Sequence, residues 1–394
     1  MDNTKQLNIE YFSLQSLFWM TYCMVVGFSV TYLLSCGYSN SEAGYILASA
    51  NICALILQPF FADLADRSKK INAMTIFLVS IEIIFVCSIG LFFIGVRSLI
   101  LTLIYVVMIT LANAVIAFLT SIQFLMDTSK SKINFGLCRA GGSLCFAILS
   151  ALMGIMIERI GMKSIPLALF IITLLIIGLC IFITRHSING NIKAVLTLEK
   201  KRSSSLFVFF NENPRFMILS IAMLFIYYAH AFITNFTISI VRNVGGDNRE
   251  MGYLIAFMAL MELPGMIGFK EISRRFKVSS LLLFSMIMFS IKAIIVWLSP
   301  SLMTLTFGFA LQVVSFAIYI PASVQYANII IDEKDTVKAQ MMFNLMQTGG
   351  AVFSSIIGGW LIDFSGISHA LLIGAILSCI GTIIAFAGIQ NTKR

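Results

Sequence analysis

Long apolar runs separated by short polar breaks follow one another along the whole chain. A helix needs about 20 apolar residues to cross the hydrocarbon core of a bilayer. Because backbone groups in lipid must find partners within their own segment, each such run is predicted to be an α-helix. The runs are apolar on every side, which excludes the alternating pattern of a membrane β-barrel. We predict twelve spanning helices, at 11–36, 42–63, 71–95, 98–126, 136–157, 163–184, 215–241, 251–270, 278–298, 301–330, 337–362 and 367–389.

The longest polar break separates the first six predicted spans from the last six. It is basic, with a Lys-Lys-Arg sequence at 200–202 that is followed by three serines. Two groups of six spans joined by a polar segment are typical of transporters built from two repeated halves. The predicted parts are an N-terminal half at 1–185, a basic cytoplasmic linker at 186–214 and a C-terminal half at 215–394.

The net charge of +9 comes from Lys and Arg residues gathered in short clusters between the apolar runs. Such clusters are topology signals, whereas a protein that binds nucleic acid carries a basic patch or stripe on one face. The positive-inside rule predicts a multi-pass protein of the cell membrane with both termini in the cytoplasm. The predicted partners therefore include the lipid bilayer and exclude nucleic acid. The loops assigned to the opposite side hold only Arg97, Arg159, Lys163, Arg242 and Arg249.

The composition and the missing motifs argue against an enzyme. Charged residues make up 11% of the chain, against about 25% in a typical soluble domain. No Walker loop, dinucleotide fingerprint, zinc-protease motif or nucleophile elbow occurs in the sequence. The eight Cys residues are scattered through apolar runs without a CxxC pair, which favours small buried residues over disulfides or a metal site. We expect no catalytic residues, no cofactor and no metal.

A signature lies between the second and third predicted spans. The segment Ala62-Asp63-Leu64-Ala65-Asp66-Arg67-Ser68-Lys69-Lys70 resembles the G-x-L-A-D-R-x-G-R-K motif of the major facilitator superfamily, with Ala and Lys in place of its two glycines. The resemblance implies an all-α integral membrane fold of twelve transmembrane helices in two pseudo-symmetric six-helix halves. It also implies a gating role for Asp66 and Arg67. The alternative is a solvated turn that carries only topology charges.

A narrower resemblance covers most of the chain and points to the oligosaccharide–proton symporters, the lactose permease group. It implies a secondary active permease for a sugar, oligosaccharide or nucleoside-like solute, coupled to H⁺ and working by alternating access to one cavity between the halves. The matching segments are Ser41-Glu42-Ala43-Gly44, Gln58-Pro59, Asn134-Phe135-Gly136-Leu137-Cys138-Arg139 with Gly142 and Phe146, Glu262-Leu263-Pro264, and Lys292 after Ser290-Ile291.

Arg139 is the leading candidate for solute binding in the N-terminal half. A charged side chain at membrane depth is costly unless it faces a cavity or a partner. Ser143 and Phe146 follow at four and seven residues, so the three share one helix face. The guanidinium and the hydroxyl can bind solute hydroxyls, and the ring can cover an apolar sugar face. The resemblance also implies an acid on the fourth span, where the best match is Gln123. The alternative is that Arg139 only extends toward the headgroups.

Glu262 and Lys292 are the candidates for proton coupling in the C-terminal half. Glu262 stands among apolar residues in the eighth span, and Lys292 lies in the ninth. A membrane-buried carboxyl beside a cation can exchange a proton when its access to water alternates. The alternative is a static ion pair that joins the two spans.

The chain departs from the family pattern on other spans. Where the proton symporters carry a His and a Glu on the tenth span, this sequence has Gln312 and Ser315. Gln347 replaces an expected Lys, and Tyr227 and His230 replace expected acids. We predict that His230, Gln312 and Gln347 bind solute together with Glu262. Proton coupling would then depend on Glu262, and a facilitator or a symporter for another ion stays open. A His in this position is more often a hydrogen-bonded core residue than a proton carrier, and both interpretations of His230 stay open.

An internal parallel suggests a further contact. Ser80-Ile81-Glu82 in the third span matches Ser290-Ile291-Lys292 in the ninth. Because these spans correspond in the two halves, we expect Glu82 to contact Asn51 as Lys292 contacts Glu262.

Two other functions remain as alternatives. The chain has 34 Phe and 21 Met residues, which could line a permissive cavity for the export of amphipathic compounds. A non-transporting membrane sensor that keeps the fold is the second, because a fold does not by itself establish transport.

Overall fold

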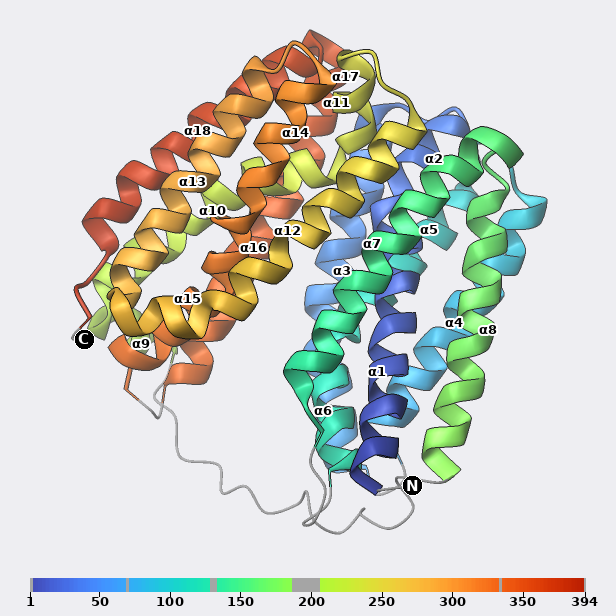
Figure 1. Cartoon of the computed structure of the whole chain (residues 1–394), viewed down its shortest axis with the longest axis horizontal. Helices are drawn as coiled ribbons and strands as arrows, with labels where there is room; N and C mark the ends of the chain where they lie inside the picture. The colour runs from blue at the N-terminus through green and yellow to red at the C-terminus, as the bar shows by residue number, and fades with distance from the viewer. Residues whose placement is uncertain (1–2, 69–70, 128–132, 186–205, 333–334, 393–394) are drawn as a thin grey trace. The chain divides into compact units, whose positions relative to one another are not determined.

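The computed structural model describes residues 3–68, 71–127, 133–185, 206–332 and 335–392 (Figure 1). Every regular element among these residues is helical. Eleven helices are long and apolar enough to cross a membrane, and the bent pair at the N-terminus makes twelve spans when it is counted as one. The structure thus confirms the all-α fold with twelve spans, which we number in chain order.

Close packing divides the chain into two units. Unit 1 comprises residues 1–39 and 49–199, and unit 2 comprises residues 40–48 and 200–394. Unit 1 holds α1 (Asn3–Tyr22), η1 (Cys23–Gly27) and α2 (Ser29–Ser35) as span 1, most of α3 (Asn40–Arg67) as span 2, α4 (Ala73–Phe93) as span 3, α5 (Leu99–Ala114) and α6 (Ile116–Met126) as span 4, α7 (Phe135–Ile160) as span 5 and α8 (Ser164–Ile183) as span 6.

Unit 2 begins its own helices with α9, which lies inside the predicted linker and packs Phe209 against Phe216. Residues 186–205 of that linker lie outside the described residues. The elements are α9 (Leu206–Glu212), α10 (Pro214–Asn235) and α11 (Thr237–Asn243) as span 7, α12 (Asn248–Arg275) as span 8, α13 (Val278–Leu298) as span 9, α14 (Leu302–Ala310), η3 (Leu311–Val313) and α15 (Phe316–Ile330) as span 10, α16 (Thr336–Phe353), η4 (Ser354–Gly358) and α17 (Gly359–Ser365) as span 11, and α18 (Ile367–Gly388) as span 12.

Side-chain caps define several helix starts. Asn72, Ser98 and Asn134 each accept a bond from a backbone N–H in the first turn of α4, α5 and α7. Such caps satisfy N–H groups that have no partner within the helix. Span 1 begins at residue 3 and not at 11 as predicted, because the polar residues before the apolar run join the helix. There Gln6 donates to Glu10 at 2.8 Å, one turn away.

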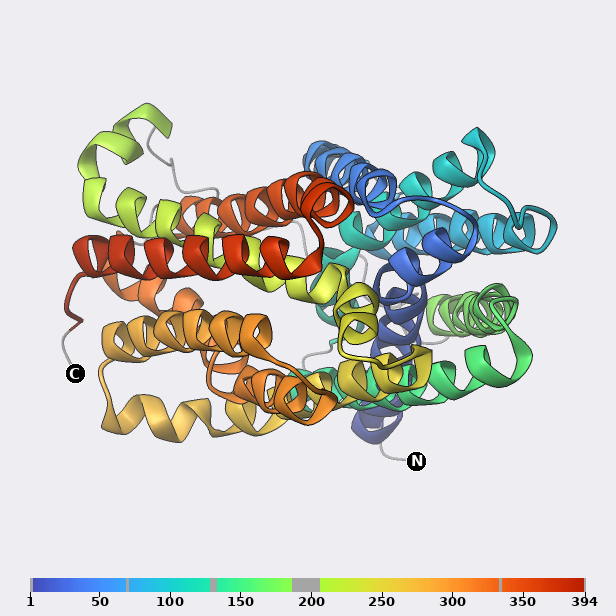
Figure 2. The same ribbon diagram turned by 90° about the horizontal axis from the view of Figure 1, so that it is seen from above.

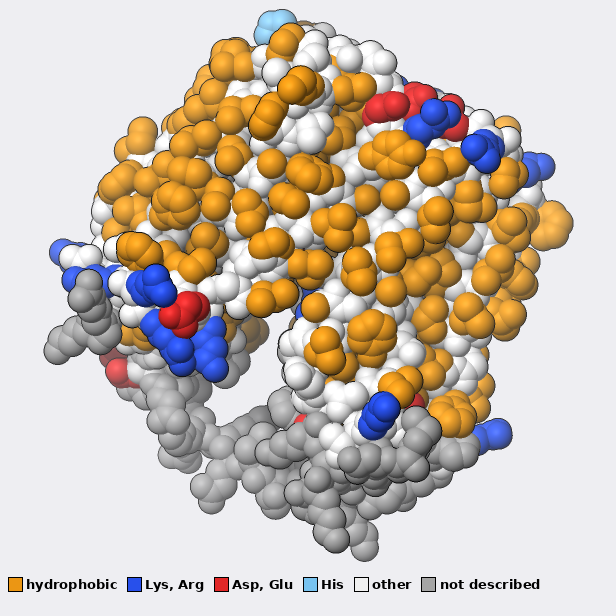
Figure 3. Space-filling model, viewed as in Figure 1, with side chains coloured by type: hydrophobic (Ala, Val, Ile, Leu, Met, Phe, Trp, Pro, Cys, Tyr) orange, Lys and Arg blue, Asp and Glu red, His pale blue; other side chains and the backbone are white. Residues whose placement is uncertain are grey.

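Within each unit the helices pack side by side. In unit 1, α1 lies against α7 and α8, and α4 lies against α5 and α8. In unit 2, α10 lies against α16 and α18, and α13 lies against α15 and α18, as Figure 2 shows for α10, α13 and α18. The outward side chains are largely hydrophobic (Figure 3). This apolar exterior suits a protein whose solvent is lipid.

Five spans are interrupted in the described part of the chain, and in span 7 the break lies at Phe236 between α10 and α11. Span 1 contains the π-helix η1, and span 4 breaks at Val115 between α5 and α6. Span 10 contains the 3₁₀ turn η3, and span 11 contains the π-helix η4. The hydropathy pattern predicted none of these interruptions, because a π or 3₁₀ turn changes the backbone pairing without changing the apolar content. Such turns are frequent at functional sites.

The first residues of α3 belong to unit 2 because Asp363 caps that helix from α17. Its carboxylate accepts bonds from the backbone N–H groups of Asn40 at 3.2 Å and Ser41 at 2.7 Å. It also accepts from the Asn40 carboxamide at 2.9 Å and the Ser41 hydroxyl at 2.6 Å. A negative charge at a helix N-terminus is stabilising.

Candidate functional site

In unit 1, Arg139 is held from two sides. Its Nη1 donates to Ser143 Oγ at 2.7 Å, one turn along α7. Its guanidinium carbon lies 4.0 Å from the centre of the Trp19 ring on α1, within the range of a cation–π interaction. Gly142 makes this approach possible, since a Cβ there would lie 2.6 Å from the Trp19 ring. The cation is therefore fixed between a hydroxyl and an aromatic face.

Trp19 is itself fixed by a chain of hydrogen bonds. Its indole N–H donates to Gln15 Oε1 at 3.0 Å, and Gln15 Nε2 donates to the Tyr11 hydroxyl at 2.7 Å. Tyr11 in turn donates to the carbonyl of Leu119 on α6 at 2.9 Å. The chain joins α1 to span 4 and leaves the indole one orientation. We name Trp19, Arg139 and Ser143 the arginine cluster.

The other predicted residues of unit 1 lie apart from this arrangement. The Phe146 ring is half-buried beside Gly27 of η1. Gln123 is half-buried on α6, and within the described residues its side chain does not hydrogen-bond Arg139. Trp19 was not predicted. The sequence feature that indicates a site residue here is a large aromatic residue four positions after a glutamine in an apolar span.

In unit 2, Lys292 and Glu262 are joined through Gln312. Lys292 is 1% exposed, and its Nζ donates to Gln312 Oε1 at 2.6 Å. Gln312 Nε2 donates to Glu262 Oε1 at 2.9 Å. Lys292 also contacts Met258 Sδ at 3.8 Å and lies 5.6 Å from the centre of the Phe309 ring. We name Lys292, Gln312 and Glu262 the polar chain.

The backbone explains how Gln312 reaches both partners. It is the middle residue of η3, where span 10 tightens into a 3₁₀ turn. Gly265 on α12 packs against this turn, and a Cβ there would lie 2.5 Å from the Val313 carbonyl oxygen. Glu262 stands about one turn earlier on α12. Because Gly265 has no side chain, α12 approaches η3 closely, and this approach puts Glu262 within reach of Gln312.

An aromatic cluster lies one helical turn from the polar chain. His230 on α10 stacks on Phe316 with 5.0 Å between ring centres and meets Phe289 edge-on at 5.2 Å. Phe289 precedes Lys292 by three residues, and Phe316 follows Gln312 by four. His230 is 7% exposed, and its Nδ1 has no hydrogen-bond partner among the described residues.

The same cluster includes two tyrosines. Tyr227 lies 5.3 Å from His230 and 5.8 Å from Tyr319 between ring centres. Gln347 Nε2 donates to the Tyr319 hydroxyl at 2.9 Å, so Gln347 borders the cluster. Ser315 stands where the proton symporters carry a Glu on the tenth span. Its Oγ donates to the Leu311 carbonyl one turn earlier in the same span. Because His230 Nδ1 has no hydrogen-bond partner among the described residues, this atom does not support the alternative that His230 is a hydrogen-bonded core residue.

One predicted contact is wrong. Glu82 lies on an exposed face of α4, whereas Asn51 on α3 accepts a hydrogen bond from Asn113 Nδ2 at 3.0 Å. The internal parallel identified corresponding positions, but the outer side of span 3 faces away from α3. Asp66 and Arg67 are in the last turn of α3, and their side chains lie outside the described part of the structure.

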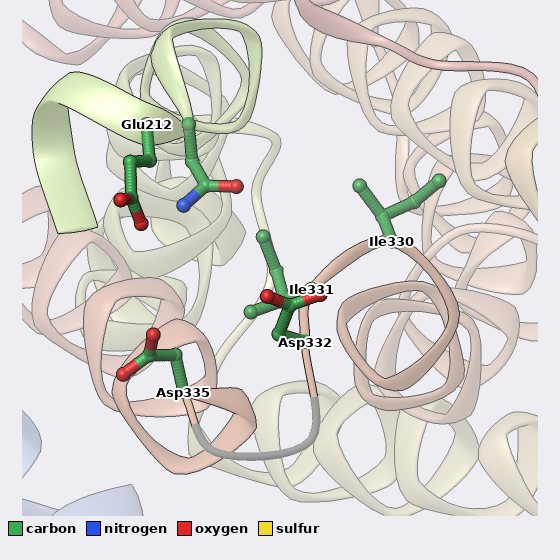
Figure 4. Close-up of a pocket in the computed structure, with 6 residues that line it drawn as sticks. Glu212, Ile330, Ile331, Asp332 and Asp335 are labelled. Atoms are coloured by element: carbon green, nitrogen blue, oxygen red, sulfur yellow. The ribbon is translucent and has the colours of Figure 1, made fainter. Parts of the chain in front are cut away.

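A cavity of about 300 Å³ opens in unit 2 away from these residues (Figure 4). Acidic and apolar side chains and one carboxamide line it, and none of the predicted site residues is among them. Within the described ranges, no group of three or more His, Cys, Asp or Glu residues could hold a metal ion. The lining residues are Glu212, Asn213, Ile330, Ile331, Asp332 and Asp335.

The chain is similar to curated membrane proteins along most of its length. It is 21% identical over 347 residues to the maltose permease of Geobacillus stearothermophilus, covering 88% of this chain and 85% of that protein. It is 25% identical over 361 residues to the uncharacterized transporter YwbF of Bacillus subtilis (strain 168), covering 87% and 83%.

Solved structures share the fold at lower identity. A mutant form of the nucleoside transporter NupG aligns with a TM-score of 0.80 at 15% identity, covering 98% of this chain and 99% of that one. A POT family peptide transporter aligns at 0.77 and 10% identity, covering 97% and 96%. Residues 7–372 match the MFS_1 like family. The chain is therefore a multi-pass membrane transporter that belongs to the MFS_1 like family of the major facilitator superfamily.

Proposed function

We propose that this protein is a secondary permease for a small polyhydroxylated solute, a sugar, oligosaccharide or nucleoside, and that H⁺ drives it. The observation that carries the proposal is the polar chain of unit 2. A fully buried Lys292 bonded through Gln312 to Glu262 is costly to keep in a membrane protein. Such groups mark substrate and proton pathways.

The polar chain offers a route for coupling. Protonation of Glu262 removes the negative charge that Gln312 bonds and so weakens that bond, because a neutral carboxyl is a weaker acceptor than a carboxylate. A solute hydroxyl can replace the Gln312 oxygen on Lys292, because its lone pairs also accept a hydrogen bond. Solute binding and protonation thus act on the same amide, which is what coupling requires.

The solute class follows from the groups that surround these charges. The arginine cluster pairs a guanidinium and a hydroxyl with an aromatic ring. The polar chain stands beside rings that include His230 and Phe316. Hydroxyl-binding groups next to aromatic faces suit a ring that is polar at its edge and less polar on its face. The relatives named a maltose permease and a nucleoside transporter are in keeping with this class.

We propose the cell membrane as its location, with both termini in the cytoplasm, where basic loops are favoured. Gln123, Phe146 and Gln347 are proposed to contribute to solute binding. Asp66 and Arg67 at the end of α3 are proposed to gate the cytoplasmic side. An Arg67→Ala variant should then slow uptake and leave the equilibrium affinity for solute unchanged.

The test is transport by the purified protein in proteoliposomes, with labelled maltose and uridine as probes. The wild type should exchange one of them and accumulate it under an inward proton gradient. Arg139→Ala should abolish both exchange and accumulation. Glu262→Gln should keep exchange and lose accumulation, because the variant cannot carry the proton.

Glu82→Gln is the matched control, since it removes an exposed acid from another span. It should behave as the wild type does. The proposal fails if neither probe is exchanged, or if Arg139→Ala transports normally. Exchange of lipophilic cations that Arg139→Ala leaves intact would favour an exporter.

A further inference from the structure

Three helices of unit 1 meet at a group of uncharged polar side chains. The Tyr22 hydroxyl on α1 donates to Asn113 Oδ1 on α5 at 3.0 Å. Asn113 Nδ2 donates to Asn51 Oδ1 on α3 at 3.0 Å. Gln58 Nε2, two turns further along α3, donates to the Asn113 carbonyl at 3.3 Å. We name Tyr22, Asn51 and Asn113 the amide cluster, and all three side chains are half-buried.

The amide cluster lies where two spans are interrupted. Tyr22 is the last residue of α1 before the π-helix η1, and Asn113 is the last but one of α5 before the break at Val115. The two interrupted regions are in contact, since α5 packs against η1. π-turns inside helices are frequent at functional sites. Two carboxamides at membrane depth also indicate a functional site, because apolar residues would pack these helices at lower cost.

The amide cluster is continuous with the arginine cluster. Trp19 and Tyr22 are three residues apart on α1, with 5.3 Å between their ring centres. Trp19 also contacts the Arg139 guanidinium. A row of side chains therefore runs from Ser143 through Arg139, Trp19 and Tyr22 to the carboxamides.

We propose that Tyr22, Asn51 and Asn113 form a subsite for the hydroxyl groups of a neutral solute, next to Arg139. This rests on the proposed function, in which Arg139 binds the solute. Each carboxamide has donors and acceptors, and the phenol has one donor and lone pairs. The groups can exchange bonds among themselves for bonds to a hydroxyl without leaving a buried polar atom unpaired. With no charge among its members, the subsite takes the uncharged part of the solute.

The competing explanation is that the amide cluster only ties α1, α3 and α5 together. Thr110 provides the matched control, because it joins α5 to α3 one turn earlier. Its Oγ1 donates to the Ala50 carbonyl on α3 at 3.2 Å, beside Asn51. A purely structural role predicts similar effects of Thr110→Val and Asn113→Leu on stability and on affinity. A binding role predicts that only Asn113→Leu weakens affinity beyond its effect on folding.

The experiment is equilibrium binding of labelled maltose and uridine to the full-length protein in lipid nanodiscs, with melting temperatures measured alongside. For the probe that the wild type binds, Asn113→Leu should weaken affinity about tenfold, the loss expected for one or two hydrogen bonds. Tyr22→Phe keeps the ring and removes the hydroxyl, so it should weaken affinity severalfold with little change in melting. Thr110→Val should stay within about twofold of the wild type.

The outcomes separate the two proposals. If Arg139→Ala abolishes binding while Asn113→Leu and Tyr22→Phe bind normally, the subsite is refuted and the permease stands. If Thr110→Val weakens affinity as much as Asn113→Leu does, the amide cluster is structural. If the wild type binds neither probe, both the proposed function and the subsite are refuted. Should Asn113→Leu fail to fold, Tyr22→Phe decides alone.

Discussion

Gln312 bonds a cationic and an anionic side chain with the two ends of one carboxamide. Its oxygen accepts from Lys292 and its nitrogen donates to Glu262. A carboxamide can satisfy both, because it presents an acceptor and donors in a fixed geometry. Gln312 stands where the proton symporters carry a His, and its two hydrogen bonds connect the side chains of Lys292 and Glu262.

Replacing Gln312 by Leu should lower the free energy of unfolding by about 3 kcal/mol, because Lys292 Nζ would be left in the interior without an oxygen acceptor. Adding Lys292→Met should recover most of that loss, since no buried cation then remains. Urea or thermal unfolding in detergent measures both changes. A double variant no more stable than Gln312→Leu would show that Lys292 is not stabilised by the amide.

A second residue, Gly265, decides whether Glu262 reaches Gln312. Gly265→Ala should cost about 1–3 kcal/mol of stability, because the new methyl group would overlap the Val313 carbonyl and force α12 away from η3. Gly268→Ala is the control on the same helix, where a Cβ meets the Ile272 side chain at an ordinary 3.7 Å. It should be neutral or stabilising by up to about 1 kcal/mol. Equal melting temperatures for the two variants would contradict the packing argument.

At the scale of elements, the turn η3 and the π-helix η1 lie beside polar clusters. The turn η3 carries Gln312, and the π-helix η1 follows Tyr22. A regular helix points successive side chains about 100° apart, and a 3₁₀ or π turn changes that angle locally. The turn η3 therefore aims Gln312 in a direction that an unbroken span would not allow.

The start of α12 is fixed by a capping box in which Asp247 accepts from the N–H groups of Arg249 and Glu250. Asp247→Ala should cost about 1 kcal/mol at neutral pH. The Glu250 side chain and these two amides hold the pKa of Asp247 below its usual value. The stabilisation is therefore present above the ordinary aspartate pKa and is lost as the pH falls through the lowered one.

Unfolding of the wild type and of Asp247→Ala, compared between neutral and acidic pH, tests this cap. The two should converge in stability only at the acid end. Convergence already near pH 6 would mean that another group provides the cap.

At the scale of the whole molecule, the apolar exterior and the basic loops determine how the chain lies in a membrane. Hydrophobic side chains cover most of the face in Figure 3, whereas Lys and Arg gather near its edges. Moving the clustered cations across the bilayer would cost far more than moving the few in the opposite loops. The distribution of charge is therefore the basis of the proposed orientation.

Reporter fusions in a bacterial host test this orientation. Alkaline phosphatase fused after Arg394 should be inactive, because the enzyme folds only outside the cytoplasm. The same reporter fused at Gly245, between spans 7 and 8, should be active. The reverse pattern would contradict the proposed topology of both termini.

Periodicity predicted contacts within a helix better than contacts between helices. The four-residue spacing of Arg139 and Ser143 predicted that they share a face, and they are hydrogen-bonded. The proximity of Glu262 and Lys292 was inferred from a family resemblance, which did not reveal that Gln312 lies between them. The expected Asn51–Glu82 contact failed because sequence spacing does not give the rotation of a helix about its axis.

The sequence by itself determined that this protein crosses the membrane in twelve helices, because apolar length and backbone pairing leave no other solution for such a chain. It also singled out the few charged residues at membrane depth, because each is costly there. Only the tertiary structure decided which groups meet these charges. Trp19 reaches Arg139 because Gly142 leaves room, and Gln312 reaches Glu262 because η3 turns toward Gly265. Such contacts depend on helix rotation and on local breaks in helical pairing, which hydrophobicity along the chain does not encode.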